Sequence, residues 1–311
     1  AKRKHLEEAT EAPELAEDPP ELVTPVGWWF GRRGCQAGHF STPSGVVALG
    51  DDRLAVADCG NHRVQILTIR GEFLRAVGTG FQNPESVAVL GDGNLVVCDT
   101  GNHRVVVISQ RGTMVRTIGA AGTRVGYFLE PRGVAVLHDG NLVVSDQDNN
   151  RLQIFTPDGE IVRQVGPKLT GLKGSLRNPR GVGVLASGNI AVCDYSGDRV
   201  VLVTPEGGFV SCIGAHGVGH AEFTLPRSVA GLPDGSMAVA DVGNRRVQIL
   251  SESGEYLSCI TEPLLAVGEP LAVASAGNMR VAVTGSNHQV QVLQLEESCP
   301  LVKSAAFHER R

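Results

Sequence analysis

The sequence contains few aromatic residues and no long apolar run. Phe, Trp and Tyr make up only 5% of its 311 residues, although 42% are hydrophobic. No stretch approaches the roughly 18 apolar residues that a membrane-spanning helix requires. Residues 1–21 also lack the apolar core of a signal peptide. These absences predict a soluble protein without a membrane partner and without a secretion signal in the sequence as given.

Cysteine is present in an odd number, seven, and no two cysteines form a C-x-x-C pair. This pattern argues against a disulfide framework and against a zinc cluster. Reduced thiols are typical of proteins in the cytosol. We therefore expect a cytoplasmic protein whose cysteines are reduced and buried.

No excess charge of either sign marks most of the chain. The formal net charge is −5, and residues 1–22 contribute −4 of it through three bases and seven acids. Three prolines and few apolar residues predict that residues 1–22 form a disordered acidic linker. Residues 23–311 then form one nearly neutral domain, whose global charge does not indicate a nucleic-acid partner.

One pattern occurs six times along the chain. Each copy starts with a proline that is followed by any residue, a small residue and valine; the prolines are Pro43, Pro84, Pro131, Pro179, Pro226 and Pro270. An aspartate follows fifteen residues after each of the first five prolines, whereas the sixth copy has Thr284 one residue early. The intervals between these positions run from 41 to 48 residues. This period is typical of one four-stranded propeller blade.

Turn residues divide each copy into four short apolar stretches, which we interpret as strands. Gly91–Asn94, for example, has the composition of a hairpin turn between the first and second strands. Such a sheet cannot bury both faces alone, so the six sheets are expected to close around an axis. The predicted fold is an all-β, six-bladed β-propeller. Residues 26–30 are expected to supply the fourth strand of blade six, with residues 301–307 as the alternative.

Three copies carry a longer shared motif: Asp58-Cys-Gly-Asn-His-Arg63, Asp99-Thr-Gly-Asn-His-Arg104 and Asp241-Val-Gly-Asn-Arg-Arg246. This motif resembles the NHL repeat, and the resemblance spans about residues 25–295. NHL propellers often form the C-terminal recognition domain of TRIM ubiquitin ligases, where they bind RNA or protein. They also occur in a lyase that acts on peptidyl-hydroxyglycine. The resemblance to TRIM-NHL proteins implies that any ligase activity lies upstream, since no RING or B-box cysteine pattern is present here.

The repeated aspartate and the arginine five residues later flank one turn, so they are expected to form structural ion pairs. The predicted pairs are Asp58 with Arg63, Asp99 with Arg104, Asp146 with Arg151, Asp194 with Arg199, and Asp241 with Arg246. Blade six has lost both partners together, having Thr284 and Gln289 instead. Joint loss is expected of a pair, because one remaining buried charge is costly. Asn61 and its counterparts in other copies are interpreted as turn residues with a left-handed backbone.

Charge is sorted between the two faces of the predicted propeller. The loop that leads into each first strand and the turn between the second and third strands lie on one face, here called the proline face. The opposite, hairpin face carries eleven acids against three bases. The acids are Asp51, Asp52, Glu72, Asp92, Asp139, Asp158, Glu160, Glu206, Asp234, Glu252 and Glu255, and the bases are Arg53, Arg70 and Arg111.

The proline face carries the candidate ligand-binding residues. The residue after the blade proline is arginine in three successive blades: Arg132, Arg180 and Arg227. We expect these arginines at exposed loop ends near the axis, where guanidinium groups would contact phosphates or carboxylates. The connection before Arg180 adds further bases without any acid: Lys168, Lys173 and Arg177. Tyr195 is expected to stack on a base or a side chain of the ligand.

These features predict a non-catalytic recognition domain that binds RNA or an acidic protein segment, and the resemblance implies that it recruits protein substrates for ubiquitination. A protein-only scaffold and a metal-dependent lyase or lactonase are the alternatives. The sequence has no G-x-S-x-G elbow, P-loop or H-E-x-x-H motif. His216, His220 and Glu222 could coordinate a metal, but their glycine-rich surroundings do not preorganise ligands. We therefore expect neither a metal nor another cofactor.

Overall fold

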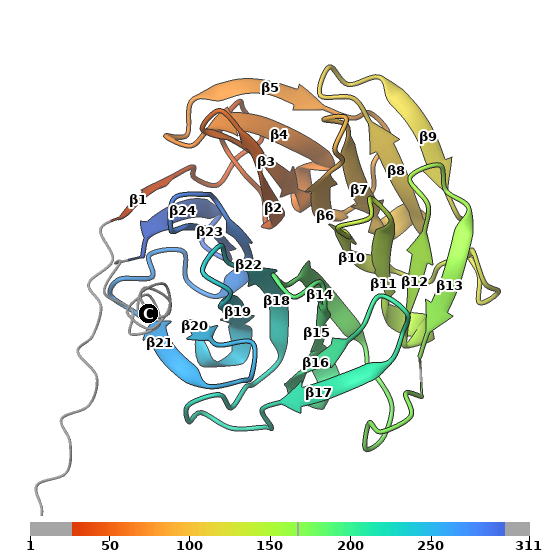
Figure 1. Ribbon diagram of the computed structural model, residues 1–311. Coiled ribbons are helices and arrows are strands. Elements are labelled where there is room, and N and C mark those ends of the chain that lie inside the picture. The colour runs from red at the N-terminus through yellow and green to blue at the C-terminus, as the bar shows by residue number, and fades with distance from the viewer. Residues whose placement is uncertain (1–26, 167, 296–311) are drawn as a thin grey trace, which may run out of the picture.

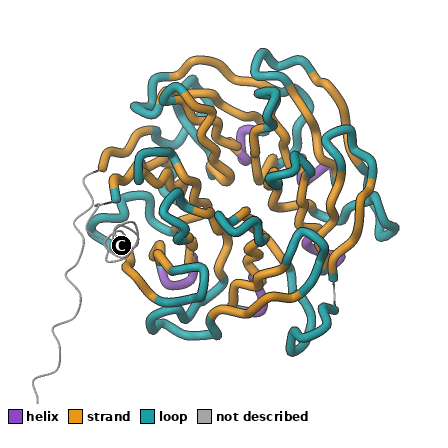
Figure 2. The backbone as a smooth tube through the Cα atoms, viewed as in Figure 1, coloured by secondary structure: helices purple, strands orange, loops and turns teal. Residues whose placement is uncertain are grey.

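The protein is a ring of six four-stranded antiparallel sheets, as a computed structural model that describes residues 27–166 and 168–295 shows (Figure 1). Each sheet is one blade, whose first strand lies at the axis and whose fourth strand lies at the rim. Strands and loops dominate the described chain, and its helices are five short 3-10 turns (Figure 2). The predicted six-bladed all-β propeller is confirmed. None of the described helices is long and apolar enough to cross a membrane.

Blades 1 to 5 each consist of four consecutive strands. Blade 1 contains β2 (Pro43–Gly50), β3 (Arg53–Asp58), β4 (Arg63–Thr68) and β5 (Phe73–Val77). Blade 2 contains β6 (Pro84–Val89), β7 (Leu95–Asp99), β8 (Arg104–Ile108) and β9 (Met114–Ile118). Blade 3 contains β10 (Pro131–Val136), β11 (Leu142–Asp146), β12 (Arg151–Phe155) and β13 (Ile161–Val165). Blade 4 contains β14 (Pro179–Val184), β15 (Ile190–Asp194), β16 (Arg199–Val203) and β17 (Phe209–Ile213). Blade 5 contains β18 (Pro226–Gly231), β19 (Met237–Asp241), β20 (Arg246–Leu250) and β21 (Tyr256–Ile260).

Blade 6 combines both ends of the described chain. It contains β22 (Pro270–Ser275), β23 (Arg280–Gly285), β24 (Gln289–Gln294) and, as its outer strand, β1 (Gly27–Phe30). The 3-10 turns lie between the second and third strands of the other blades: η1 (Cys59–Asn61), η2 (Thr100–Asn102), η3 (Gln147–Asn149), η4 (Tyr195–Gly197) and η5 (Val242–Asn244).

The β1 strand closes the ring as predicted. It pairs antiparallel with β24, with Gly27 opposite Leu293 and Phe30 opposite Val290. Trp28 is half-buried and donates its indole N–H to the Ile69 carbonyl of blade 1 at 2.8 Å. The neighbouring Trp29 is 57% exposed, because adjacent side chains of a strand face opposite sides of the sheet. The predicted linker 1–22 and the alternative strand 301–307 lie outside the described residues.

The core lies between neighbouring blades and not inside any one of them. Ala55, Val64 and Ile66 of blade 1, for instance, pack with Val87 and Val97 of blade 2 in one buried cluster. Each sheet therefore buries both faces only when its neighbours are in place, which is why the repeats fold as a closed ring.

Crowding at the axis explains the small residue of the repeat. A Cβ atom added at Gly133 would lie 2.3 Å from the Arg180 carbonyl oxygen of blade 4, and one added at Gly181 would lie 2.5 Å from the Ser228 Cα of blade 5. Neither position has room for a side chain without moving the neighbouring backbone. The inner strands thus approach each other so closely that the second residue after each blade proline must be small.

The five predicted ion pairs all form. In each, the arginine Nε lies 2.7 to 2.8 Å from Oδ2 of a fully buried aspartate. The other aspartate oxygen accepts a backbone N–H from the loop that leads into the same blade, as Asp99 does from Gln82 at 2.7 Å. In blade 6, the Ser286 hydroxyl takes over this second role by accepting the N–H of Glu269 at 3.0 Å. Each aspartate therefore fixes the incoming loop to the turn.

Asn61 and its counterparts at the same repeat position do not adopt the left-handed backbone that the sequence suggested. The left-handed residue is the next one, His62 in blade 1 with φ of 56° and its counterparts in the other turns. The Asn61 side chain instead donates to Asp58 Oδ2 at 2.8 Å and to the Gly34 carbonyl at 2.8 Å. The asparagine is thus part of the aspartate network, and its side chain rather than its backbone freedom explains its recurrence.

Replacing Asp99 by alanine is predicted to lower the free energy of unfolding by about 3 to 5 kcal/mol, because Arg104 and the Gln82 N–H lose their buried partner. Arg116→Ala is the control, since it removes one member of an exposed ion pair with Asp158 and is expected to cost less than about 1 kcal/mol. Urea denaturation of both variants and the parent measures the difference. An Asp99→Ala protein as stable as the control variant would show that the network is not structural.

Candidate functional site

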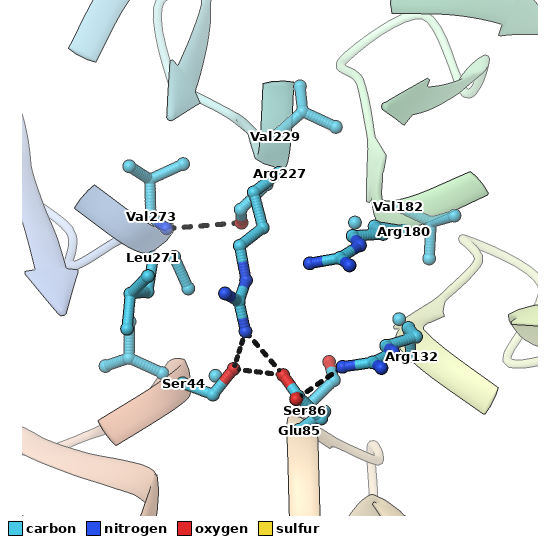
Figure 3. A pocket seen from close by; sticks show the side chains of 16 residues that line it. Ser44, Glu85, Ser86, Arg132, Arg180, Val182, Arg227, Val229, Leu271 and Val273 are labelled. Carbon is cyan, nitrogen blue, oxygen red and sulfur yellow. Dashed lines mark hydrogen bonds and ion pairs between the residues drawn. The ribbon is translucent and has the colours of Figure 1, made fainter. Parts of the chain in front are cut away.

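The residue that follows each blade proline points into the mouth of the axial cavity. The register between the first and second strands shifts just after the proline in every blade, and such a bulge re-aims the side chain of an unpaired residue. The six residues at this position form what we call the axial ring: Ser44, Glu85, Arg132, Arg180, Arg227 and Leu271. They surround a cavity of about 80 Å³ on the proline face (Figure 3).

Deeper along the inner strands, the cavity is lined by small residues and by valines, including Val46, Val182, Val229 and Val273. The axial site therefore combines a charged mouth with an apolar lining. The predicted arginines do meet at this mouth, although they come from three different blades. Their predicted exposure was wrong: Arg132 and Arg227 lie on inner strands with side chains only 19% and 18% exposed. The neighbouring inner strands at the axis bury these side chains, which would be exposed at the end of a loop.

Two of the three arginines form ion pairs with Glu85. Arg132 Nη1 lies 2.6 Å from Glu85 Oε1, and its Nη2 lies 2.7 Å from Glu130 Oε2. Arg227 Nη2 lies 2.7 Å from Glu85 Oε2 and donates to the Ser44 hydroxyl at 3.3 Å. Blades 2 and 5 are opposite in the ring, so the bridge between Glu85 and Arg227 spans the axis (Figure 3).

Glu85 is held in its charged form. Burial alone would raise its pKa, but the charges of Arg227 and Arg132 and the hydrogen bond from Ser44 Oγ at 2.6 Å hold the pKa of this carboxyl below its usual range. The sequence reasoning missed Glu85. Comparing all six residues that follow the blade prolines would have found it, because it occupies the same repeat position as the arginines.

Arg180 differs from the other two arginines. Among the described residues no carboxylate pairs with it, whereas Arg132 and Arg227 each have one. The buried Nε of Arg180, like that of Arg132, has no hydrogen-bond partner there. Its guanidinium lies 3.7 Å from the centre of the Tyr195 ring. Arg180 therefore stacks on the aromatic ring that was expected to stack on a ligand. Burial, together with the charges of Arg227 and Arg132, lowers the pKa of Arg180 to about 10. Arg180 remains charged at neutral pH, and its charge is poorly compensated.

The other predicted ligand-binding bases are separate from the axial ring. Lys168, Lys173 and Arg177 are exposed on the connection between β13 and β14. Lys168 and Arg177 line a different, open hollow together with Leu176 and neighbouring polar residues. The structure therefore does not bring these bases together with the three arginines.

The proline face is also less uniformly basic than the sequence suggested. Several acids lie among its bases, in the loops before the first strands and in the turns after the second strands: Glu130, Asp148, Asp198, Glu222 and Glu269. Nη2 of Arg245, in the turn of blade 5, lies 3.8 Å from Oε1 of Glu269. Acids thus interrupt the positive charge of this face, which is not uniformly basic.

The candidate metal ligands do not converge. His216 lies beside Asp198, with Nδ1 3.1 Å from Oδ2, while the ring of His220 stacks on Tyr256. Within residues 27–166 and 168–295, no three His, Cys, Asp or Glu side chains are grouped so that they could hold a metal ion. The axial ring has three arginines and one glutamate, and this excess of positive charge attracts anions rather than metal cations.

The comparisons with known proteins agree with this fold. Residues 40–67, 81–108 and 128–155 each match the NHL repeat, whereas none of the curated proteins matches the sequence. Among solved structures, a streptogramin B lyase is 14% identical with a TM-score of 0.60, and 89% of each chain is covered. A gluconolactonase from Xanthomonas campestris is 15% identical with a TM-score of 0.67, covering 84% of this chain and 88% of its own.

A virginiamycin B lyase from Staphylococcus aureus, solved in an inactive form with quinupristin, is also similar in fold. It is 13% identical with a TM-score of 0.58, and the match covers 83% of this chain and 86% of the lyase. At such identities the likeness extends to the architecture alone. The chain is a six-bladed β-propeller that carries NHL repeats.

Proposed function

We propose that this propeller is a non-catalytic recognition domain that binds an acidic protein segment at its axial mouth, with one carboxylate of the segment on Arg180. One observation carries the proposal: within residues 27–166 and 168–295, the largely buried guanidinium of Arg180 has no carboxylate partner, whereas both other arginines of the cluster have one. A buried charge without a partner is costly to the fold. A carboxylate from a ligand would supply the missing partner and match the planar guanidinium fork.

Three features favour a protein segment over RNA. Single-stranded RNA binding combines a continuous basic track with exposed aromatic platforms for the bases. Here acids interrupt the bases of the proline face, and Arg180 covers one face of Tyr195. A cavity of about 80 Å³ suits one small anionic group better than a polynucleotide backbone. In the role that the resemblance to TRIM-NHL proteins implies, the propeller would deliver this segment to a ubiquitin-ligase module.

Selection from a random displayed peptide library tests the function, since it requires no knowledge of the natural partner. The parent protein is expected to enrich peptides that contain Asp or Glu, with affinities that fall as salt increases. Arg180→Met should abolish this enrichment. Arg177→Met, which removes an exposed arginine outside the axial cavity, is the matched control and should retain it.

Enriched peptides without acidic residues, or equal enrichment by Arg180→Met, would contradict the proposal. A parallel titration with labelled single-stranded RNA covers the alternative ligand. Salt-sensitive RNA binding that the parent has and Arg180→Met lacks would assign the site to nucleic acid instead.

Thermal unfolding separates a binding role for Arg180 from a structural one. The lowered pKa means that the folded protein holds this charge less favourably than the unfolded chain does, at any pH below about 10. Arg180→Met removes the charge and keeps the apolar stem, so its melting temperature should equal or exceed that of the parent. A clearly lower melting temperature would show that Arg180 stabilises the fold through contacts of its own.

A further inference from the structure

The guanidinium groups of the axial ring are occupied by protein acceptors to different degrees. Arg132 uses Nη1 on Glu85 and Nη2 on Glu130, and Arg227 uses Nη2 on Glu85 and Ser44. Within the described residues the guanidinium of Arg180 donates no hydrogen bond at all. The mouth therefore presents one complete, free guanidinium fork, although three arginines surround it.

Resting on the proposed function, we infer that Glu85 sets the charge and shape of the ligand. Glu85 acts as a built-in carboxylate that occupies Arg132 and Arg227, so that the site accepts one carboxylate on Arg180 and rejects tetrahedral dianions such as a phosphoryl group or sulfate. Glu85 is therefore a specificity-determining residue of this site.

The donor geometry supports this selectivity. A carboxylate is planar and is satisfied by two parallel N–H groups of one guanidinium, whereas a tetrahedral dianion has several strong acceptor oxygens that need donors from more than one direction. The second and third arginines that could supply those donors are turned toward Glu85 (Figure 3). A dianion on Arg180 would therefore have acceptors left without partners in a partly buried site, which is unfavourable.

The charge balance points in the same direction. Three arginines against Glu85 and Glu130 leave a local excess of one positive charge, which one monoanion neutralises. Glu85 is only 11% exposed and is fixed on both oxygens, so it cannot swing away from an incoming anion at low cost. A second negative charge on the ligand would meet the fixed charge of Glu85 across the same small cavity, without a further free cation beside it.

Acetate and sulfate are suitable probes, because they differ in charge and shape and both stay ionised at mildly acidic pH. The site-specific readout is the NMR signal of the Arg180 Nε–H, identified by its absence in Arg180→Met, during titrations at ionic strength matched with sodium chloride. The parent should bind acetate more tightly than sulfate. Glu85→Gln should raise the sulfate affinity by at least about tenfold, the effect of roughly one charge-assisted hydrogen bond.

Glu130→Gln is the matched control, because it removes the same charge from the same Arg132 and leaves the bridge across the axis in place. Its sulfate affinity should change far less than that of Glu85→Gln. Should Glu85→Gln fold poorly, the double variant Glu85→Gln with Arg132→Gln keeps the charge balance. It still releases Arg227 beside Arg180, so the same gain in sulfate affinity is expected.

The possible failures are distinguishable. Acetate that moves the Arg180 signal in the parent, together with a sulfate gain below tenfold in both Glu85 variants, overturns the role of Glu85 and leaves the proposed function standing. An equal gain in Glu130→Gln also overturns it, since net charge alone would then decide. If neither anion moves the signal in the parent or the variants, the proposed function fails as well.

Discussion

The close approach of six inner strands around one axis is the constraint on which both the fold and the site depend. It excludes a side chain where Gly133 and Gly181 face the backbone of the next blade. It also forces the residues that follow the blade prolines to share one small cavity. Residues more than a hundred positions apart in the chain, such as Glu85 and Arg227, therefore become direct partners. A charge at any position of the axial ring must then be compensated by another member of the ring or by a ligand.

The chain contains two sets of partly buried arginines, which differ in how their charge is compensated. Those of the turns, such as Arg104, each have an aspartate of the same blade as a partner, so their charge is compensated locally. In the axial ring, Arg132 and Arg227 both pair with Glu85 of blade 2, and there are fewer carboxylates than guanidiniums. The first set is complete in five blades and is absent in blade 6. The second set is incomplete at Arg180, which is why we assign function to it and structure to the first.

The repeat made most of the fold predictable from the sequence. The six prolines mark the inner strands, and the missing fourth strand of blade 6 identified residues 26–30 as the closing strand, because a propeller cannot leave one blade short. The ion pairs were predictable since both partners lie in one repeat and disappear together. Turn geometry was harder to predict from the sequence. Asn61 was assigned a backbone role, whereas its side-chain amide donates hydrogen bonds to Asp58 and to a loop carbonyl.

The site was predictable only in part, because its electrostatics depend on pairings across the axis. Sequence reasoning grouped Arg132, Arg180 and Arg227 by their shared repeat position, yet it could not tell that two of them are occupied. Sorting charges by face overestimated the basic surface, since acids such as Glu130 lie on the same face. Distances within a repeat can be inferred from its period, whereas contacts between opposite blades depend on side-chain reach. Glu85 became visible as a partner only when the ring was closed.

The position that follows each blade proline can change without disturbing the propeller. It lies at a bulge and outside the regular ladder, and its side chain faces the cavity rather than the packing between blades. Serine, glutamate, arginine and leucine all occur there on inner strands of the same geometry. The repeat therefore separates residues that hold the ring together from one residue per blade that is free to specify a ligand. In this chain, four adjacent blades carry charge at that position and two do not, so the mouth has a polar side and a side lined by Leu271. An anion on Arg180 would lie between the polar side and the Leu271 side of the mouth. This difference between the two sides would determine how the segment attached to the anion is oriented.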